Sequence, residues 1–217
     1  TGGVLKYKSS IKVEFNKIKK IIRLGSPMAV QRVLFTIINI FLAKIIAVFG
    51  SDAIAAHKVG GQIESVAYMV IGGFNNAVAS FTGQNYGAKK YKRIKAGYHS
   101  ALIVGLSYAF IISAGFLLFN KPLVRLFIKE GNTVEIAMSY LKVVAFSQVF
   151  SAVEMISNGL FTGIGKPKIP AKISIIFTSL RIPLAWGLIK AFGINGVWIS
   201  ITVTSILKGI CSYSIYR

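Results

Sequence analysis

Six long apolar segments constrain this chain more than any other feature. They cover approximately residues 27–49, 59–82, 98–119, 136–160, 173–190 and 196–214. A helix needs about 20 apolar residues to cross a bilayer, and a hydrophobic fraction of 54% exceeds that of an ordinary soluble domain. The fifth segment is the shortest, and Arg181 and Pro183 interrupt it. We therefore predict an all-α polytopic membrane protein, a bundle of six transmembrane helices.

The positive charge of the chain is distributed unevenly among the connections. Residues 1–24, 83–97 and 163–172, together with Arg217, carry sixteen Lys and Arg, whereas the alternate connections carry five. Cytoplasmic loops of membrane proteins collect Lys and Arg. We therefore expect a multi-pass protein of the cell (plasma or inner) membrane with both termini cytoplasmic. We expect residues 1–24 to form a basic amphipathic interfacial segment and residues 25–217 to form the bundle.

The stretch SFTGQNYGAKKYKRIKAG at 80–97 holds five cations within seven residues. On a soluble protein it would indicate a nucleic-acid site, but here it lies between two apolar segments and is too short to form a domain. We predict that it is a cytoplasmic loop that anchors the topology, with Gly83 and Gly87 permitting the turn. We expect the partners to be the lipid bilayer and a small organic substrate, and no nucleic acid.

Two acidic residues fall inside the apolar segments, where an ionisable group is costly and usually faces a cavity or a partner. Glu64 lies near the outer end of the second segment. It is either a carboxylate that binds a proton, a sodium ion or a cationic substrate, or the partner of Lys44 or Lys58 in a structural ion pair. Glu154 lies in the fourth segment and lines either a transport path or a helix interface.

Polar residues accompany these acids at helical spacing. Gln148, Ser151, Glu154 and Asn158 share one face of the fourth segment, and such a stripe must face protein or water rather than lipid. The remaining candidates for the substrate or ion pathway are Asn75, Asn76, Gln31, Asn39 and Arg181. Hydrogen bonding between packed helices is the competing interpretation of these polar residues.

Cations also lie within the apolar segments. Lys44 and Lys208 are close enough to helix ends to extend their ammonium groups to the interface. Arg32 and Arg181 are deeper, and we expect them to pair with acids, with another part of the protein, or with an anionic lipid headgroup.

No enzymatic or metal chemistry is indicated. His57 and His99 are far apart and have no clustered ligands, and Cys211 is the only cysteine. No phosphate-binding loop or nucleophile elbow is present in the sequence. We therefore expect no enzyme, no catalytic residue, no cofactor and no metal site, and the sequence does not assign ligands for a sodium ion.

Several stretches together resemble the multidrug and toxic compound extrusion (MATE) family. The more specific ones are GQNYGA at 83–88 and LRIPLA at 180–185, and they are accompanied by LGSPMAVQRVLF, FGSDAIAAHKVGGQIES, GLFTGIGKPKIP and FGINGVWISI in the expected order. The resemblance covers nearly the whole chain. It implies the C-terminal six-helix half of a twelve-helix transporter, whose N-terminal half would be the partner, and the chain begins at Thr1, as a fragment would.

The resemblance also implies export of organic cations, drugs or other amphipathic compounds in antiport with sodium ions or protons. Some members carry a carboxylate near the position of Phe35, and others carry an aspartate near Ser151. This chain has neither, so coupling roles for Glu64 and Glu154 do not follow from those branches.

Two alternatives remain open at this stage. One is a flippase of lipid-linked saccharides from the same superfamily, which a cavity with converging Arg32, Lys142 and Arg181 would favour. The other is a membrane scaffold or receptor without transport, which tightly packed helices without a lateral cavity would favour.

Overall fold

The computed structural model describes residues 14–129 and 131–217, and all the regular structure within them is helical. The helices, in chain order, are α1 Phe15–Ala47, α2 Ser51–Gly87, α3 Tyr91–Leu118, α4 Asn120–Arg125, α5 Gly131–Ala145, α6 Gln148–Gly163, α7 Lys168–Ser179, α8 Arg181–Phe192 and α9 Ile194–Tyr216. The prediction of an all-α fold is therefore confirmed.

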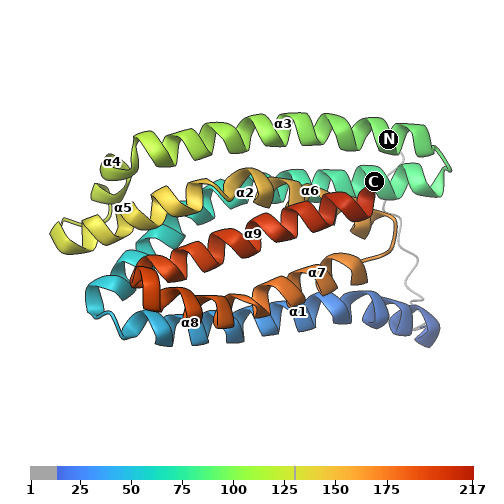
Figure 1. Ribbon diagram of the computed structural model, residues 1–217. Helices are drawn as coiled ribbons and strands as arrows, with labels where there is room; N and C mark the ends of the chain where they lie inside the picture. The colour runs from blue at the N-terminus through green and yellow to red at the C-terminus, as the bar shows by residue number, and fades with distance from the viewer. Residues whose placement is uncertain (1–13, 130) are drawn as a thin grey trace, which may run out of the picture.

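The long helices run side by side along one axis of the molecule (Figure 1). Among the described residues, α1, α3, the α7–α8 segment and α9 are long and apolar enough to cross a membrane. The pair α5–α6, bent by 56°, is a fifth span if it is counted as one. The 37-residue helix α2 lies alongside them (Figure 1), so the bundle is consistent with the six predicted spans.

Successive long helices are antiparallel. The α2–α3 and α6–α7 links lie at the end of the bundle where α1 begins and α9 finishes, and the α1–α2, α3–α5 and α8–α9 links lie at the opposite end (Figure 1). We call the first of these the basic end, because it carries the cation-rich connections Ala88–Lys90 and 164–167 and the C-terminal Arg217.

The helix boundaries differ from the predicted ones around the GQNYGA stretch. Helix α2 continues to Gly87 and α3 begins at Tyr91, so the expected loop is only three residues long. Gly83 and Gly87 are helical, and the turn instead uses Lys89, with φ of 56°. The prediction that these two glycines make the turn was therefore wrong.

The division expected at residue 24 falls within the single helix α1. Residues 1–13 of the expected amphipathic segment lie outside the described residues, so that segment stays a prediction. The interruption expected at Arg181 is present, because α7 ends at Ser179 and α8 starts at Arg181.

Close helix packing brings polar side chains from different helices together. Helix α6 is packed between α2, α3 and α9. A Cβ atom at Gly159 of α6 would collide with the carbonyl oxygen of Asn75 on α2, and one at Gly209 of α9 would collide with the carbonyl oxygen of Phe150 on α6. Small residues of this kind let helix backbones approach each other in membranes.

Gly159→Ala should lower the thermal stability of the purified protein in detergent, because the added methyl group meets a backbone atom that cannot move aside. We expect a loss of about 1–3 kcal/mol, as for other overpacked sites. The matched control is Gly73→Ala on α2, where no atom lies within 4 Å of the added Cβ. Equal melting temperatures for the two variants would contradict the close approach of α2 and α6.

Candidate functional site

The carboxylate of Glu64 is the centre of a buried polar cluster. Its side chain lies on α2, and the residue is only 8% exposed. The Tyr68 hydroxyl and the Gln148 side-chain amide each donate to Oε1 at 2.8 Å, and the Tyr140 hydroxyl donates to Oε2 at 2.7 Å. Three helices, α2, α5 and α6, therefore contribute donors to a single carboxylate.

The bend between α5 and α6 positions two of these donors. Tyr140 lies on α5 before the bend, and Gln148 is the first residue of α6 after it. Both contact Glu64 because the chain turns by 56° between them. Local sequence explains the third donor, since Tyr68 lies four residues after Glu64 and therefore on the same helix face.

Side chains donate to the backbone carbonyls at the bend, where the Val144 carbonyl also accepts the Ser147 N–H at 3.0 Å. The Ser147 hydroxyl donates to the Val144 carbonyl at 2.8 Å, and Gln148 Nε2 lies 3.3 Å from the same oxygen. The Ser113 hydroxyl of α3 donates to the Ala145 carbonyl at 2.8 Å. Backbone groups at membrane depth need such partners, because no water is available there.

The partners of Glu64 are all neutral. Within residues 14–129 and 131–217, the ion pairs are Lys17–Glu14 and Lys208–Glu154. Lys44 and Lys58, the expected alternative partners, are both exposed and form no ion pair with it. A buried carboxylate without a positive partner is expensive, and hydroxyl and amide donors reduce that cost without neutralising the charge.

The second acid, Glu154, has a different environment. Its Oε2 lies 3.3 Å from Nζ of Lys208 on α9, and both residues are buried. The expectation that Lys208 extends to the interface was wrong. A buried ammonium pairs with the nearest carboxylate because removal from water penalises an isolated charge.

The polar stripe of α6 connects the two acids. Gln148 contacts Glu64, Ser151 lies 3.4 Å from the Tyr68 hydroxyl, and Glu154 binds Lys208. All three stripe residues are buried, so the stripe faces protein, as its spacing predicted. Asn158, the last member, is half-buried, and its Oδ1 has no hydrogen-bond partner among the described residues.

Arg181 is buried at the start of α8 and does not join either acid in an ion pair. Its Nε donates to Thr204 at 3.0 Å and its terminal nitrogen donates to Ser205 at 3.1 Å. Arg32 and Lys142, by contrast, are exposed. The three cations whose convergence would favour the flippase alternative thus lie in different environments.

The other residues predicted for the substrate or ion pathway form no hydrogen bond with Glu64. Asn75 donates to the Met155 carbonyl at 2.7 Å and links α2 to α6. Asn76 is exposed. Gln31 and Asn39 on α1 are half-buried, and their side chains form no hydrogen bond within the described part of the chain.

Sequence reasoning missed both tyrosines and an adjacent aromatic cluster. Tyr140 contacts Trp198 edge to face at a centroid distance of 4.9 Å, and His57 stacks on Trp198 at 5.3 Å. The i to i+4 spacing could have identified Tyr68. No local signal relates Tyr140 to Glu64, because 76 residues separate them. Among the described residues, no three His, Cys, Asp or Glu side chains form a group that could hold a metal ion.

Comparisons with known proteins agree with this architecture. A family model described as MatE matches residues 27–186. The chain is 26% identical, over 204 residues, to a probable multidrug resistance protein NorM of Thermotoga maritima, and the match covers 93% of this chain and 44% of that protein. The chain thus spans about half the length of the curated relatives it matches.

Solved structures have the same fold as this chain. The bent form of the Vibrio cholerae MATE transporter VcmN superposes with a TM-score of 0.88 at 22% identity, over 97% of this chain and 48% of that one. A MOP superfamily transporter from Pyrococcus furiosus gives 0.85 at 20% identity, over 91% and 44%. Since the family model matches well over half of the 217 residues, the chain belongs to the MatE family.

Proposed function

We propose that this chain forms one six-helix half of a secondary active efflux transporter that exports organic cations, drugs or other amphipathic compounds in antiport with protons or sodium ions. The observation that carries the proposal is the buried Glu64 carboxylate, which three neutral donors from three helices hold at the bend between α5 and α6. The name of the Thermotoga maritima relative, multidrug resistance protein, supports export as the direction of transport.

The geometry gives a physical reason for coupling. Ionised Glu64 accepts all three hydrogen bonds, but a protonated carboxyl group carries a donor of its own. The new O–H group needs an acceptor and its oxygen is a weaker acceptor than before, so the hydrogen bonds of Tyr68, Tyr140 and Gln148 rearrange. Because Tyr140 and Gln148 lie on opposite sides of the bend, a change in their bonding alters the balance between two arrangements of α5 and α6. A sodium ion bound to Glu64 would require the same donors to turn away.

Broken helices at the substrate and ion sites of transporters are a general feature, because their free backbone groups line a cavity. The α5–α6 bend and the α7–α8 break at Leu180 also interrupt helices, which supports the proposal of an ion site near Glu64. We also propose that the basic end faces the cytoplasm, because cytoplasmic loops collect Lys and Arg. The other six-helix half would complete the pathway.

The flippase alternative has less support. Arg181 donates to Thr204 and Ser205, whereas Arg32 and Lys142 are exposed, so these three cations do not form the common cluster that this alternative predicted. The Pyrococcus furiosus transporter is described as having a binding pocket of reversed polarity, which suggests a different function for that protein.

Glu64→Gln in the full-length transporter should reduce export by about tenfold or more, equivalent to roughly 1.4 kcal/mol. The amide keeps the shape of the carboxylate but can neither bind a proton nor attract a cation. The measurement is efflux of a fluorescent organic cation from proteoliposomes under an imposed proton gradient and, separately, an imposed sodium gradient. The gradient that drives wild-type export identifies the coupling ion.

The matched control is Glu135→Gln, which removes one carboxylate from an exposed position on α5. It should export at the wild-type rate. Wild-type export by Glu64→Gln under the driving gradient, at equal abundance in the liposomes, would refute the coupling role of Glu64.

Lys208→Met should destabilise the protein by about 3–5 kcal/mol, because it leaves the Glu154 carboxylate buried without its partner. Adding Glu154→Gln to this variant should recover most of the loss. Thermal unfolding of the single and double variants in detergent measures both effects.

Export by the same double variant tests whether Glu154 lines the transport path. We expect export to stay reduced when stability has recovered, because Glu154 lies on the polar stripe of α6 that contacts Glu64 through Gln148. Full recovery of export would restrict Glu154 to a structural role.

A further inference from the structure

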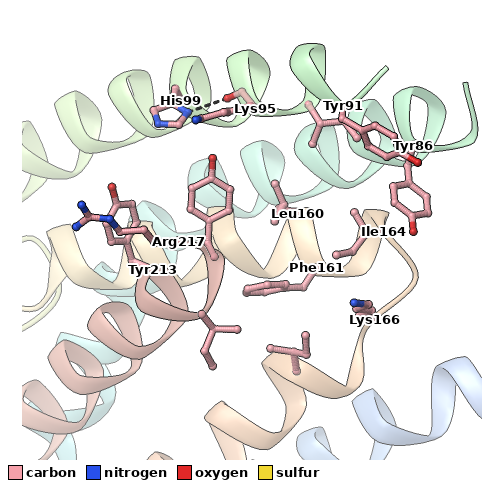
Figure 2. A pocket seen from close by; sticks show the side chains of 14 residues that line it. Tyr86, Tyr91, Lys95, His99, Leu160, Phe161, Ile164, Lys166, Tyr213 and Arg217 are labelled. Carbon is pink, nitrogen blue, oxygen red and sulfur yellow. Dashed lines mark hydrogen bonds between the residues drawn. The ribbon is translucent and has the colours of Figure 1, made fainter. Parts of the chain in front are cut away.

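A cavity lies at the basic end of the bundle, and Glu64 is not among its lining residues. Its volume is about 930 Å³. The walls come from the start of α3, the last turns of α6 and α9 and the start of α7 (Figure 2). These helix ends, distant in sequence, meet where α2 turns into α3.

Three cations line this cavity, and each comes from a different segment. They are Lys95 on α3, Lys166 in the α6–α7 link and Arg217 after α9. No acidic side chain is among the described residues that line it. A cavity lined by three cations and no described carboxylate attracts an anion.

The rest of the lining is apolar or aromatic. Ile94, Leu160 and Phe161 are buried and form part of the cavity wall. Tyr213 and Ile215, near the end of α9, are 40% and 49% exposed and lie at the outer edge. Such a surface accommodates hydrocarbon next to the charged groups, which a small inorganic anion does not need.

His99 and two tyrosines, Tyr86 and Tyr91, also line the cavity. His99 Nδ1 lies 2.8 Å from the Lys95 carbonyl oxygen (Figure 2), and the Tyr86 and Tyr91 rings meet edge to face at 5.9 Å. Tyrosine rings with a polar tip favour the headgroup level of a bilayer. The position at the helix ends therefore places the cations at headgroup depth and the apolar wall below them.

We propose that this cavity binds an anionic phospholipid of the leaflet at the basic end. Lys95, Lys166 and Arg217 contact the phosphodiester group, and the apolar wall formed by Leu160 and Phe161 receives the upper part of an acyl chain. Basic pockets between transmembrane helices are suited to anionic headgroups. This site goes beyond the proposed transport function and requires no role for Glu64.

The test uses the full-length transporter in detergent, mixed with phosphatidylglycerol or with phosphatidylcholine of the same acyl chains, and native mass spectrometry to count retained lipids. We expect the wild type to retain phosphatidylglycerol preferentially. The variant Lys95→Gln/Lys166→Gln/Arg217→Gln should lose about tenfold or more of that retention, given the contribution of each cation near an anionic headgroup.

The matched control is Lys89→Gln/Lys90→Gln/Lys92→Gln. It removes the same charge from the same end of the bundle, but none of these lysines lines the cavity. It should retain phosphatidylglycerol like the wild type. Equal losses in the two triple variants would overturn the proposal, because the attraction would then be a property of the whole basic surface.

Two further outcomes would also overturn it. Displacement of the lipid by an equal concentration of inorganic phosphate would identify a site for free phosphate. Equal retention of phosphatidylcholine would identify an apolar groove without charge selectivity. If the triple variant does not purify in a folded state, the single variants Lys95→Gln and Lys166→Gln replace it, since both side chains are exposed.

Discussion

The burial of the Glu64 carboxylate is the constraint on which the centre of the bundle depends. An acid at membrane depth needs donors, and one helix supplies only Tyr68 at the right spacing. The bend between α5 and α6 supplies the other two, Tyr140 and Gln148. At that bend the carbonyls of Val144 and Ala145 accept hydrogen bonds from the Ser147 and Ser113 hydroxyl groups, and the Ser147 N–H also donates to Val144. A straight α5–α6 helix would not place both donors on Glu64.

The polar stripe of α6 links the two intramembrane acids, which differ in charge balance. Lys208 compensates the charge of Glu154, so the pair is neutral as a unit. Glu64 has hydrogen bonds but no counter-charge. Binding of one proton or one monovalent cation would neutralise Glu64, whereas the same event at Glu154 would leave Lys208 uncompensated. This difference makes Glu64 the better candidate for an ion-binding group.

Much of the architecture could be predicted from the sequence, because apolar length, alternating loop charge and the Arg181–Pro183 interruption are local signals. Gln148 and Ser151 could be placed on one buried face by their spacing. The partners of the acids could not, since Tyr140 and Lys208 are far in sequence from Glu64 and Glu154. Gly83 was expected at the turn, but in the fold it lies within α2, which continues to Gly87.

The five cations of the basic stretch at 80–97 occupy different environments in the fold. The orientation rule weighs all five of its cations equally. The fold separates them, because Lys95 lies one turn inside α3 and lines a cavity with Lys166 and Arg217, whereas Lys89, Lys90 and Lys92 do not. Cations that only set the orientation need no particular partners. Cations that line a cavity with an apolar wall suit one class of ligand, an anionic amphiphile.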